Sequence, residues 1–137
     1  MANEAILIQL LEEKLMTVTM ADGSVGTDIQ KGTILKFTGD PNVAAASSSD
    51  GDIFAGILAE ENVGGDGQTE FAVWRHGVFA LKAAAGGATT LGHKVNITGA
   101  NLFGPANVTT AADFAEHFGT TLETTANDEV VHVLVGE

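Results

Sequence analysis

Cysteine is absent from this 137-residue chain, and so is tyrosine. Without thiols the protein has no disulfide, no thiolate metal site and no cysteine nucleophile. Aromatic residues make up only 6% of the chain, so the core must consist mainly of Val, Ile, Leu, Ala and the seven Phe. Two Pro against 17 Gly are typical of many turns between short elements. The length predicts one domain's worth of chain.

Basic residues are also scarce, with six Lys and Arg against 18 Asp and Glu and a net charge of −12. Nucleic-acid binding requires the opposite field and a local cluster of cations, so we expect no nucleic-acid partner. Solubility and mutual repulsion explain such acidity most simply. A docking surface for a basic partner and adaptation to a salty medium are the alternatives.

Long hydrophobic runs are missing. The N-terminal sequence MANEAILIQLLEEKLM has no basic leader, and Glu12, Glu13 and Lys14 interrupt its apolar run. It therefore predicts neither a signal peptide nor a membrane span, and we expect a soluble protein with no membrane partner. We interpret residues 1–20 as an N-terminal arm. Apolar spacing between Ala5 and Met16 suits a short helix, while a strand that orders only against a partner is the competing interpretation.

The remainder, residues 21–137, predicts a single, mainly β domain with short or no helices. Residues 111–118 could form one helical turn. Runs of Val, Ile, Phe and Thr separated by Gly, Asp and Asn are typical of strands. The predicted strands are Met16–Met20, Thr33–Phe37, Ile53–Ala59, Glu70–Trp74, Val78–Leu81, Lys94–Ile97, Thr120–Glu123 and Val130–Val135.

The chain also contains three internal echoes in the same order. GTILKF at Gly32 is followed by GHKVNI at Gly92, and GILAE at Gly56 by GTTLE at Gly119. EFAVW at Glu70 is echoed by VHVLV at Val131, so each offset is about 60 residues. The echoes indicate two related β-units, with chance resemblance between Gly-led strands as the alternative.

Signatures of catalysis are scarce. Phosphate-binding, nucleophile-elbow and zinc-protease motifs are all missing. The four histidines lie far apart and lack a second ligand at a recognised spacing, so we expect no metal, no cofactor and no enzymatic activity. A small hydrolase or isomerase would need two groups to converge in a pocket. Its candidate groups are a carboxylate with His76, His93 or His132.

The segment FAVWRHGVFAL holds the single Trp and the single Arg. Alternation along the strand places Phe71 and Val73 in the core and directs Trp74 and His76 outward or into a subunit contact. Trp and Arg are enriched at interface hot spots, although a Trp in a monomer core is a strong alternative. The same alternation puts His132 opposite its Val neighbours.

From FAVWRHGVFALKAAAGGATTLGHKVNI onward the chain resembles the small capsid decoration, or cement, proteins of tailed bacteriophages. The shared features are a strand, a G-V-F step at Gly77, an Ala/Gly-rich crossover at Ala83–Gly87 and a G-x-x-V strand start at Gly92. Upstream GTILKF and DIFAGILAE, and the C-terminal HFGTTLETTANDEVVHVLVGE, fit the family's pattern of Gly-led and closing strands. The resemblance spans about Val25 to the end, and the N-terminal arm departs from it.

The resemblance implies a small β-barrel or β-tulip-like domain that assembles, usually as a homotrimer, on the capsid exterior of the virion. Its partners would be the major capsid protein and itself, with assembly in the host cytoplasm, and it would stabilise the shell. Another virion β-module, in a tail, a fibre or a receptor- or glycan-binding part, is the alternative. Trp74, Arg75, His76 and His132 are candidates for the subunit or shell interface. The candidate capsid-contact residues of the arm are Ile6, Leu7, Ile8, Leu10, Leu11 and Leu15.

Overall fold

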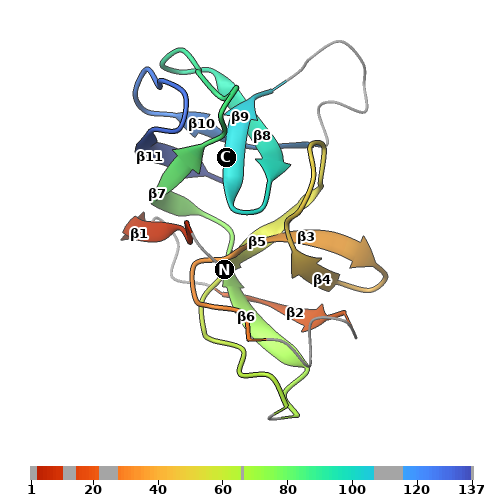
Figure 1. Ribbon diagram of the computed structural model, residues 1–137. Helices are drawn as coiled ribbons and strands as arrows, with labels where there is room; N and C mark the ends of the chain where they lie inside the picture. The colour runs from red at the N-terminus through yellow and green to blue at the C-terminus, as the bar shows by residue number, and fades with distance from the viewer. Residues whose placement is uncertain (1–2, 11–14, 22–27, 66, 107–115, 137) are drawn as a thin grey trace.

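The computed structural model describes residues 3–10, 15–21, 28–65, 67–106 and 116–136. Eleven strands account for the regular structure of these residues, as Figure 1 shows. The strands are β1 (Ile6–Leu10), β2 (Met16–Met20), β3 (Ile34–Gly39), β4 (Val43–Ala46), β5 (Phe54–Leu58), β6 (Glu70–Trp74), β7 (Gly77–Ala83), β8 (Lys94–Gly99), β9 (Leu102–Pro105), β10 (His117–Thr121) and β11 (Val130–Val135).

Two rings of five strands follow each other along the chain. In the first barrel, the strands pair in the closed order β2-β4-β3-β5-β6. In the second barrel, the order β7-β11-β10-β8-β9 is closed by a parallel pairing of β9 with β7. β1 is added to the second ring beside β7. Closing a sheet removes its unpaired edges. The prediction of a mainly β, small-barrel fold is confirmed.

The two barrels are built on the same plan. β2 pairs antiparallel with β6 and parallel with β4, and β7 pairs in the same two ways with β11 and β9. The three remaining pairings of each ring also correspond, and all are antiparallel. The predicted pair of related β-units is therefore present as two successive barrels.

One of the three sequence echoes needs a shift of one residue. Ile57 pairs with Trp74 in the first barrel and Thr120 pairs with Leu134 in the second. Trp74 thus corresponds to Leu134, and EFAVW corresponds to the segment starting at Val130 rather than at Val131. The shift is necessary because a slip of one residue would move every side chain to the other face of the strand.

Two hydrophobic cores share the strands β3 and β5. Ile34 packs in the core of the second barrel, while its neighbour Leu35 packs inside the first. Likewise, Ile57 belongs to the second core and Leu58 to the first. Successive side chains of a strand point to opposite faces, so both faces of β5 are buried and all five of its residues are inaccessible. The two cores therefore lie on opposite faces of the same two strands.

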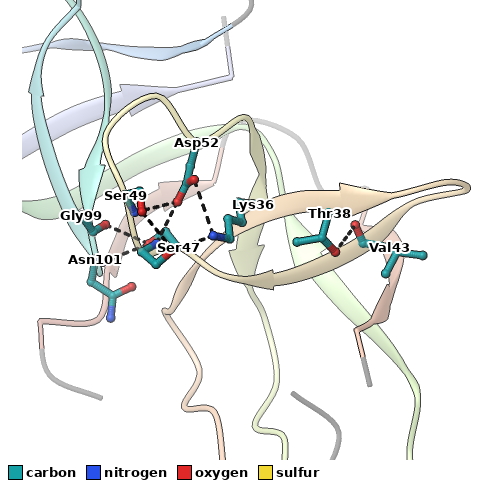
Figure 2. A network of polar contacts seen from close by, with 9 residues as sticks. Lys36, Thr38, Val43, Ser47, Ser49, Asp52, Gly99 and Asn101 are labelled. Carbon is teal, nitrogen blue, oxygen red and sulfur yellow. Dashed lines mark hydrogen bonds and ion pairs between the residues drawn. The ribbon is translucent and has the colours of Figure 1, made fainter. Parts of the chain in front are cut away.

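A polar network joins the barrels beside this core, as Figure 2 shows. The buried Asn101 side chain accepts a hydrogen bond from Ile34 N–H at 2.8 Å. The backbone N–H of Asn101 donates to Ser47 Oγ at 3.1 Å, and Ser47 Oγ donates to the Gly99 carbonyl, also at 3.1 Å. Nearby, Asp52 accepts hydrogen bonds from two backbone N–H groups and lies 3.6 Å from the Lys36 ammonium.

Two strands were missed by the sequence prediction, and their composition explains why. β4 is Val followed by three Ala inside a polar stretch, and β9 ends in Gly and Pro, so both have low β-propensity. Ring closure supplies the partners that these short strands need.

The helical interpretation of residues 5–16 does not describe this segment. Residues 6–10 and residue 16 lie in strands, whereas residues 11–14 lie outside the described part. β1 pairs antiparallel with β7 of its own chain. The predicted boundary at residue 20 falls at the end of β2, a strand of the first barrel. Of the predicted helical turn, residues 111–115 lie outside the described residues, and His117 and Phe118 belong to β10.

Candidate interaction surface

Trp74 lies at the junction of the two barrels. It ends β6 of the first barrel, is half-buried, and packs against the core of the second, with its ring centroid 5.8 Å from that of Phe79. The Lys31 ammonium lies 5.3 Å from the centroid of the Trp74 ring. Trp74 therefore forms a contact within the chain and keeps part of its surface accessible. The predicted core positions Phe71 and Val73 are confirmed, since they are at most 1% exposed.

Arg75 and His76 lie in the short connection between β6 and β7. Arg75 is exposed, and its guanidinium carbon lies 5.8 Å from the centre of the Phe54 ring. His76 is half-buried at the short connection to β7. Trp74 and Arg75 thus lie against different aromatic rings, those of Phe79 and Phe54.

The predicted arm residues divide between core and surface. Leu7 packs against the core of the second barrel, whereas Ile6 is 62% exposed and Ile8 is 47% exposed. Leu15 is also exposed. The side chain of Leu10 and the whole of Leu11 lie outside the described part of the chain. Alternation along β1 explains why Leu7 is covered while its neighbours face solvent.

An open hollow of about 360 Å³ brings Ile6 and Leu7 of the arm together with Trp74, one of the interface candidates. Its lining consists of Ala5, Ile6, Leu7, Lys31 and Trp74. Ile6 and Leu7 belong to β1, the strand added to the second barrel, and Trp74 belongs to the first barrel. Ala5 N–H donates to the Gly32 carbonyl and so holds the start of β1 beside the first barrel. Four of these lining residues are apolar or aromatic, and the fifth, Lys31, is a cation.

An exposed, largely apolar surface continues from this hollow across the second barrel. Ala80 on β7 is opposite Ile6 of β1 and also opposite His132 of β11. Leu122 N–H in turn donates to the His132 carbonyl, which places Leu122 next in the same row. Val130, 59% exposed, points outward one step along β11. We call this surface the second-barrel face and define it by Ile6, Ile8, Ala80, Leu122, Val130 and His132.

Sequence reasoning found only part of this face. It named Ile6, Ile8 and His132, but it missed Ala80, Leu122 and Val130. Val130 had a detectable signal, because alternation in VVHVLV places it on the same side as the exposed His132. The positions of Ala80 and Leu122 depend on register between strands that are distant in sequence.

Two acidic side chains perform the same structural task in the two barrels. Glu60 Oε2 accepts a hydrogen bond from Ala72 N–H at 2.8 Å, and Glu123 Oε2 accepts one from His132 N–H at 3.0 Å. The hydrogen bond from Ala72 N–H, together with one from the Gln68 amide, lowers the pKa of Glu60 below 4.5 against a smaller opposing effect of desolvation. These carboxylates hold strand ends in place.

The reactive groups of the chain are dispersed. Among the described residues, no three His, Asp or Glu side chains are arranged to hold a metal ion. His93 and His132 are exposed, while His76 and His117 are half-buried on different strands or connections. No helix within the described ranges is long and apolar enough to cross a membrane.

Comparison with known proteins gives a likeness of fold. No protein-family profile matches the sequence, and no curated protein matches it. Three solved chains do match the structure. One of them is the head fiber gp8.5 N base of bacteriophage phi29, at 13% identity and a TM-score of 0.53. The match covers 89% of this chain and 92% of that one. The two chains therefore share their fold over nearly their whole lengths.

Proposed function

We propose that this chain is a structural protein of a tailed-phage virion that binds the outer surface of the assembled head. The fold shared with a phage head-fiber base, across 89% of the chain, is the observation that carries the proposal. The sequence resemblance to capsid decoration proteins supports the same role independently of that comparison. The role requires no catalytic site and no cofactor.

The physical basis of the proposed role is binding to the lattice but not to free capsid subunits. Such binding shifts the equilibrium toward the mature shell by mass action. A homotrimer would engage several major-capsid subunits at once, so each contact can be weak while the total avidity is high. The acidic surface would face a basic patch on the shell or keep free trimers from clumping in solution.

Shell contact by the N-terminal region fits the exposed residues of β1. Ile6 and Ile8 present apolar side chains from a strand that is already ordered by β7. A preordered strand loses less conformational entropy on binding than a free arm would. We therefore propose that Ile6 and Ile8 contribute through a fixed surface rather than through a loose arm.

A second candidate function is the base of a head fiber. It is favoured by the structural neighbour, whose described part is the N base of such a fiber. Both candidates share attachment to the head. They differ in whether the chain carries a further projecting part.

Co-sedimentation with purified heads tests the proposed function. We expect the protein to bind expanded heads of the phage that encodes it, when those heads lack it, with saturation at a fixed number of copies. Binding should also raise the temperature at which the heads release their DNA. Failure to sediment with such heads would contradict the proposal. Reading frames for a major capsid protein and a head protease beside the gene would support it.

A further inference from the structure

We propose that the turn between β3 and β4, residues 40–42, binds an extended segment of the major capsid protein. The inference deepens the proposed function, on which it rests, by naming one point of contact with the head. The internal duplication carries it. The corresponding turn of the second barrel, between β8 and β9, holds a segment of the first barrel, whereas residues 40–42 are exposed.

Strand pairing equates the two turns. β3 pairs with β4 and β5 as β8 pairs with β9 and β10, and a register shift occurs near the end of both β3 and β8. The first turn has three residues, 40–42, and the second has two, 100–101. Asn42 and Asn101 each come just before the next strand, with φ values of 52° and 56°. The corresponding residues are Phe37 with Ile97, Gly39 with Gly99, and Asn42 with Asn101.

In the second barrel, this site holds the segment of the first barrel that follows β4, as Figure 2 shows. Ser47 Oγ donates to the Gly99 carbonyl and accepts from Asn101 N–H, each at 3.1 Å. Gly51 N–H donates to the Ile97 carbonyl, also at 3.1 Å. The filled site therefore recognises an extended segment that presents one hydroxyl and main-chain N–H groups.

In the first barrel, the same site is open. The hairpin that carries Thr38 and Val43 extends away from the contact between barrels in Figure 2. Phe37 is half-buried there, whereas Ile97 is fully buried. Within the described part of the chain, the bridge between residue 49 and the end of β8 has no counterpart at the end of β3. An open hollow of about 370 Å³ is lined by Phe37, Gly39, Asp40 and Asn42.

A second copy of this chain does not supply the matching segment. Ser47 N–H donates to the Ile34 carbonyl in the first barrel. The corresponding bond of the second barrel joins Ala106 N–H to the Lys94 carbonyl. A copy stacked in the same way would present Ala106 in place of the Ser47 hydroxyl, and the exposed Lys94 where the contact buries Ile34. The occupant is therefore a different protein, which in the proposed function is the major capsid protein.

The filled site specifies the chemistry of this contact. A Ser or Thr hydroxyl of the capsid segment donates to the Gly39 carbonyl and accepts from Asn42 N–H, as Ser47 does in the second barrel. The Asn42 amide oxygen accepts from a main-chain N–H of the segment, as Asn101 accepts from Ile34 N–H. Main-chain hydrogen bonds of this kind supply affinity when an extended peptide adds to a strand.

Co-sedimentation with heads that lack the protein tests the inference with two variants. Gly39→Val adds a side chain to the lining of the hollow, and its Cβ meets only Val43, in ordinary contact at 3.7 Å. Asn42→Gly keeps the left-handed turn, which Gly adopts freely, and removes the amide. Each should weaken binding to heads by about tenfold or more. Gly86→Val is the matched control, because a Cβ at Gly86 has no neighbour within 4 Å. It should bind like the wild type, and circular dichroism should show that all three variants are folded.

Hydrogen exchange supplies a second readout, since amides between Phe37 and Asn42 should become protected when the wild type binds heads. Binding that is unchanged in Gly39→Val and Asn42→Gly, or protection that omits this turn, would overturn the inference while the proposed function stands. A wild type that does not sediment with heads contradicts the proposed function and, with it, the capsid protein as occupant. If the wild type self-associates without heads and Gly39→Val abolishes that association, a second copy occupies the turn and the inference is wrong.

Discussion

Asn101 adopts a left-handed turn conformation and also makes a hydrogen bond between the two barrels. Its φ of 56° lies in the left-handed region, which Asn tolerates better than most residues. Asn42, at the corresponding turn of the first barrel, has a φ of 52° but is exposed. The buried Asn101 therefore carries the hydrogen bond to Ile34 N–H in addition to the turn.

The pair provides a matched test. Asn101→Ala should lower the free energy of unfolding by about 1–3 kcal/mol more than Asn42→Ala does, because it leaves a buried N–H without an acceptor. Urea denaturation followed by circular dichroism measures both. Equal losses in the two variants would mean that the turn conformation, and not the bond between barrels, accounts for the effect.

Glu60 links stability to pH. Its pKa is lower in the folded protein because Ala72 N–H and the Gln68 amide donate to the carboxylate. A carboxyl whose pKa is depressed by folding contributes stability above its unfolded pKa, and this contribution is lost as the pH falls through the folded value. This stability is therefore lost in the acidic range, below the ordinary glutamate pKa of 4.5.

Glu60→Gln should therefore make stability less dependent on pH in the acidic range below about pH 4.5. Glu61→Gln, next to it in sequence and exposed, is the control and should retain the wild-type slope. The urea midpoint measured at several pH values gives both slopes. Parallel curves for wild type and Glu60→Gln would contradict the assignment.

At the scale of elements, β1 is a strand with two unlike faces. Leu7 packs on the core of the second barrel, and Ile6 is 62% exposed. Leu7→Ala should cost about 1–2 kcal/mol of stability, since the side chain is only partly buried. Ile6→Ala should change stability by less than about 0.5 kcal/mol. Chemical denaturation compares the two, and a larger loss for Ile6→Ala would show that the pairing of β1 differs from that described.

At the scale of the whole molecule, the two strands shared by the cores couple the unfolding of the two barrels. Because β3 and β5 supply residues to both interiors, neither barrel can lose its core without exposing part of the other. We expect one unfolding transition, with coincident changes in Trp74 fluorescence and in far-ultraviolet circular dichroism.

Two corresponding valines test this coupling. Val73 and Val133 are both fully buried, one in each core. Val73→Ala and Val133→Ala should each lower stability by roughly 1–3 kcal/mol and shift both probes together. A variant that separates the two probes into distinct transitions would show that the barrels unfold independently.

The sequence predicted the features that depend on neighbouring residues. Alternation identified Phe71 and Val73 as core residues and His132 as outward-facing, because the side-chain period of a strand is fixed at two. The echoes at Gly32 and Gly92, and at Gly56 and Gly119, identified the two related units, since each Gly-led strand occupies the same place in its barrel.

Tertiary structure decided the features that depend on distant register. It made a strand of residues 6–10, whose spacing also suits a helix, because β7 offers a line of backbone partners. Tertiary structure also buried both faces of β5, because the second barrel covers the face that points away from the first. An alternating sequence pattern predicts only one buried face. The fold also placed Ile6 and His132 on either side of Ala80. Local sequence determines which face of its strand a side chain occupies. The pairing of distant strands determines which residues that side chain contacts.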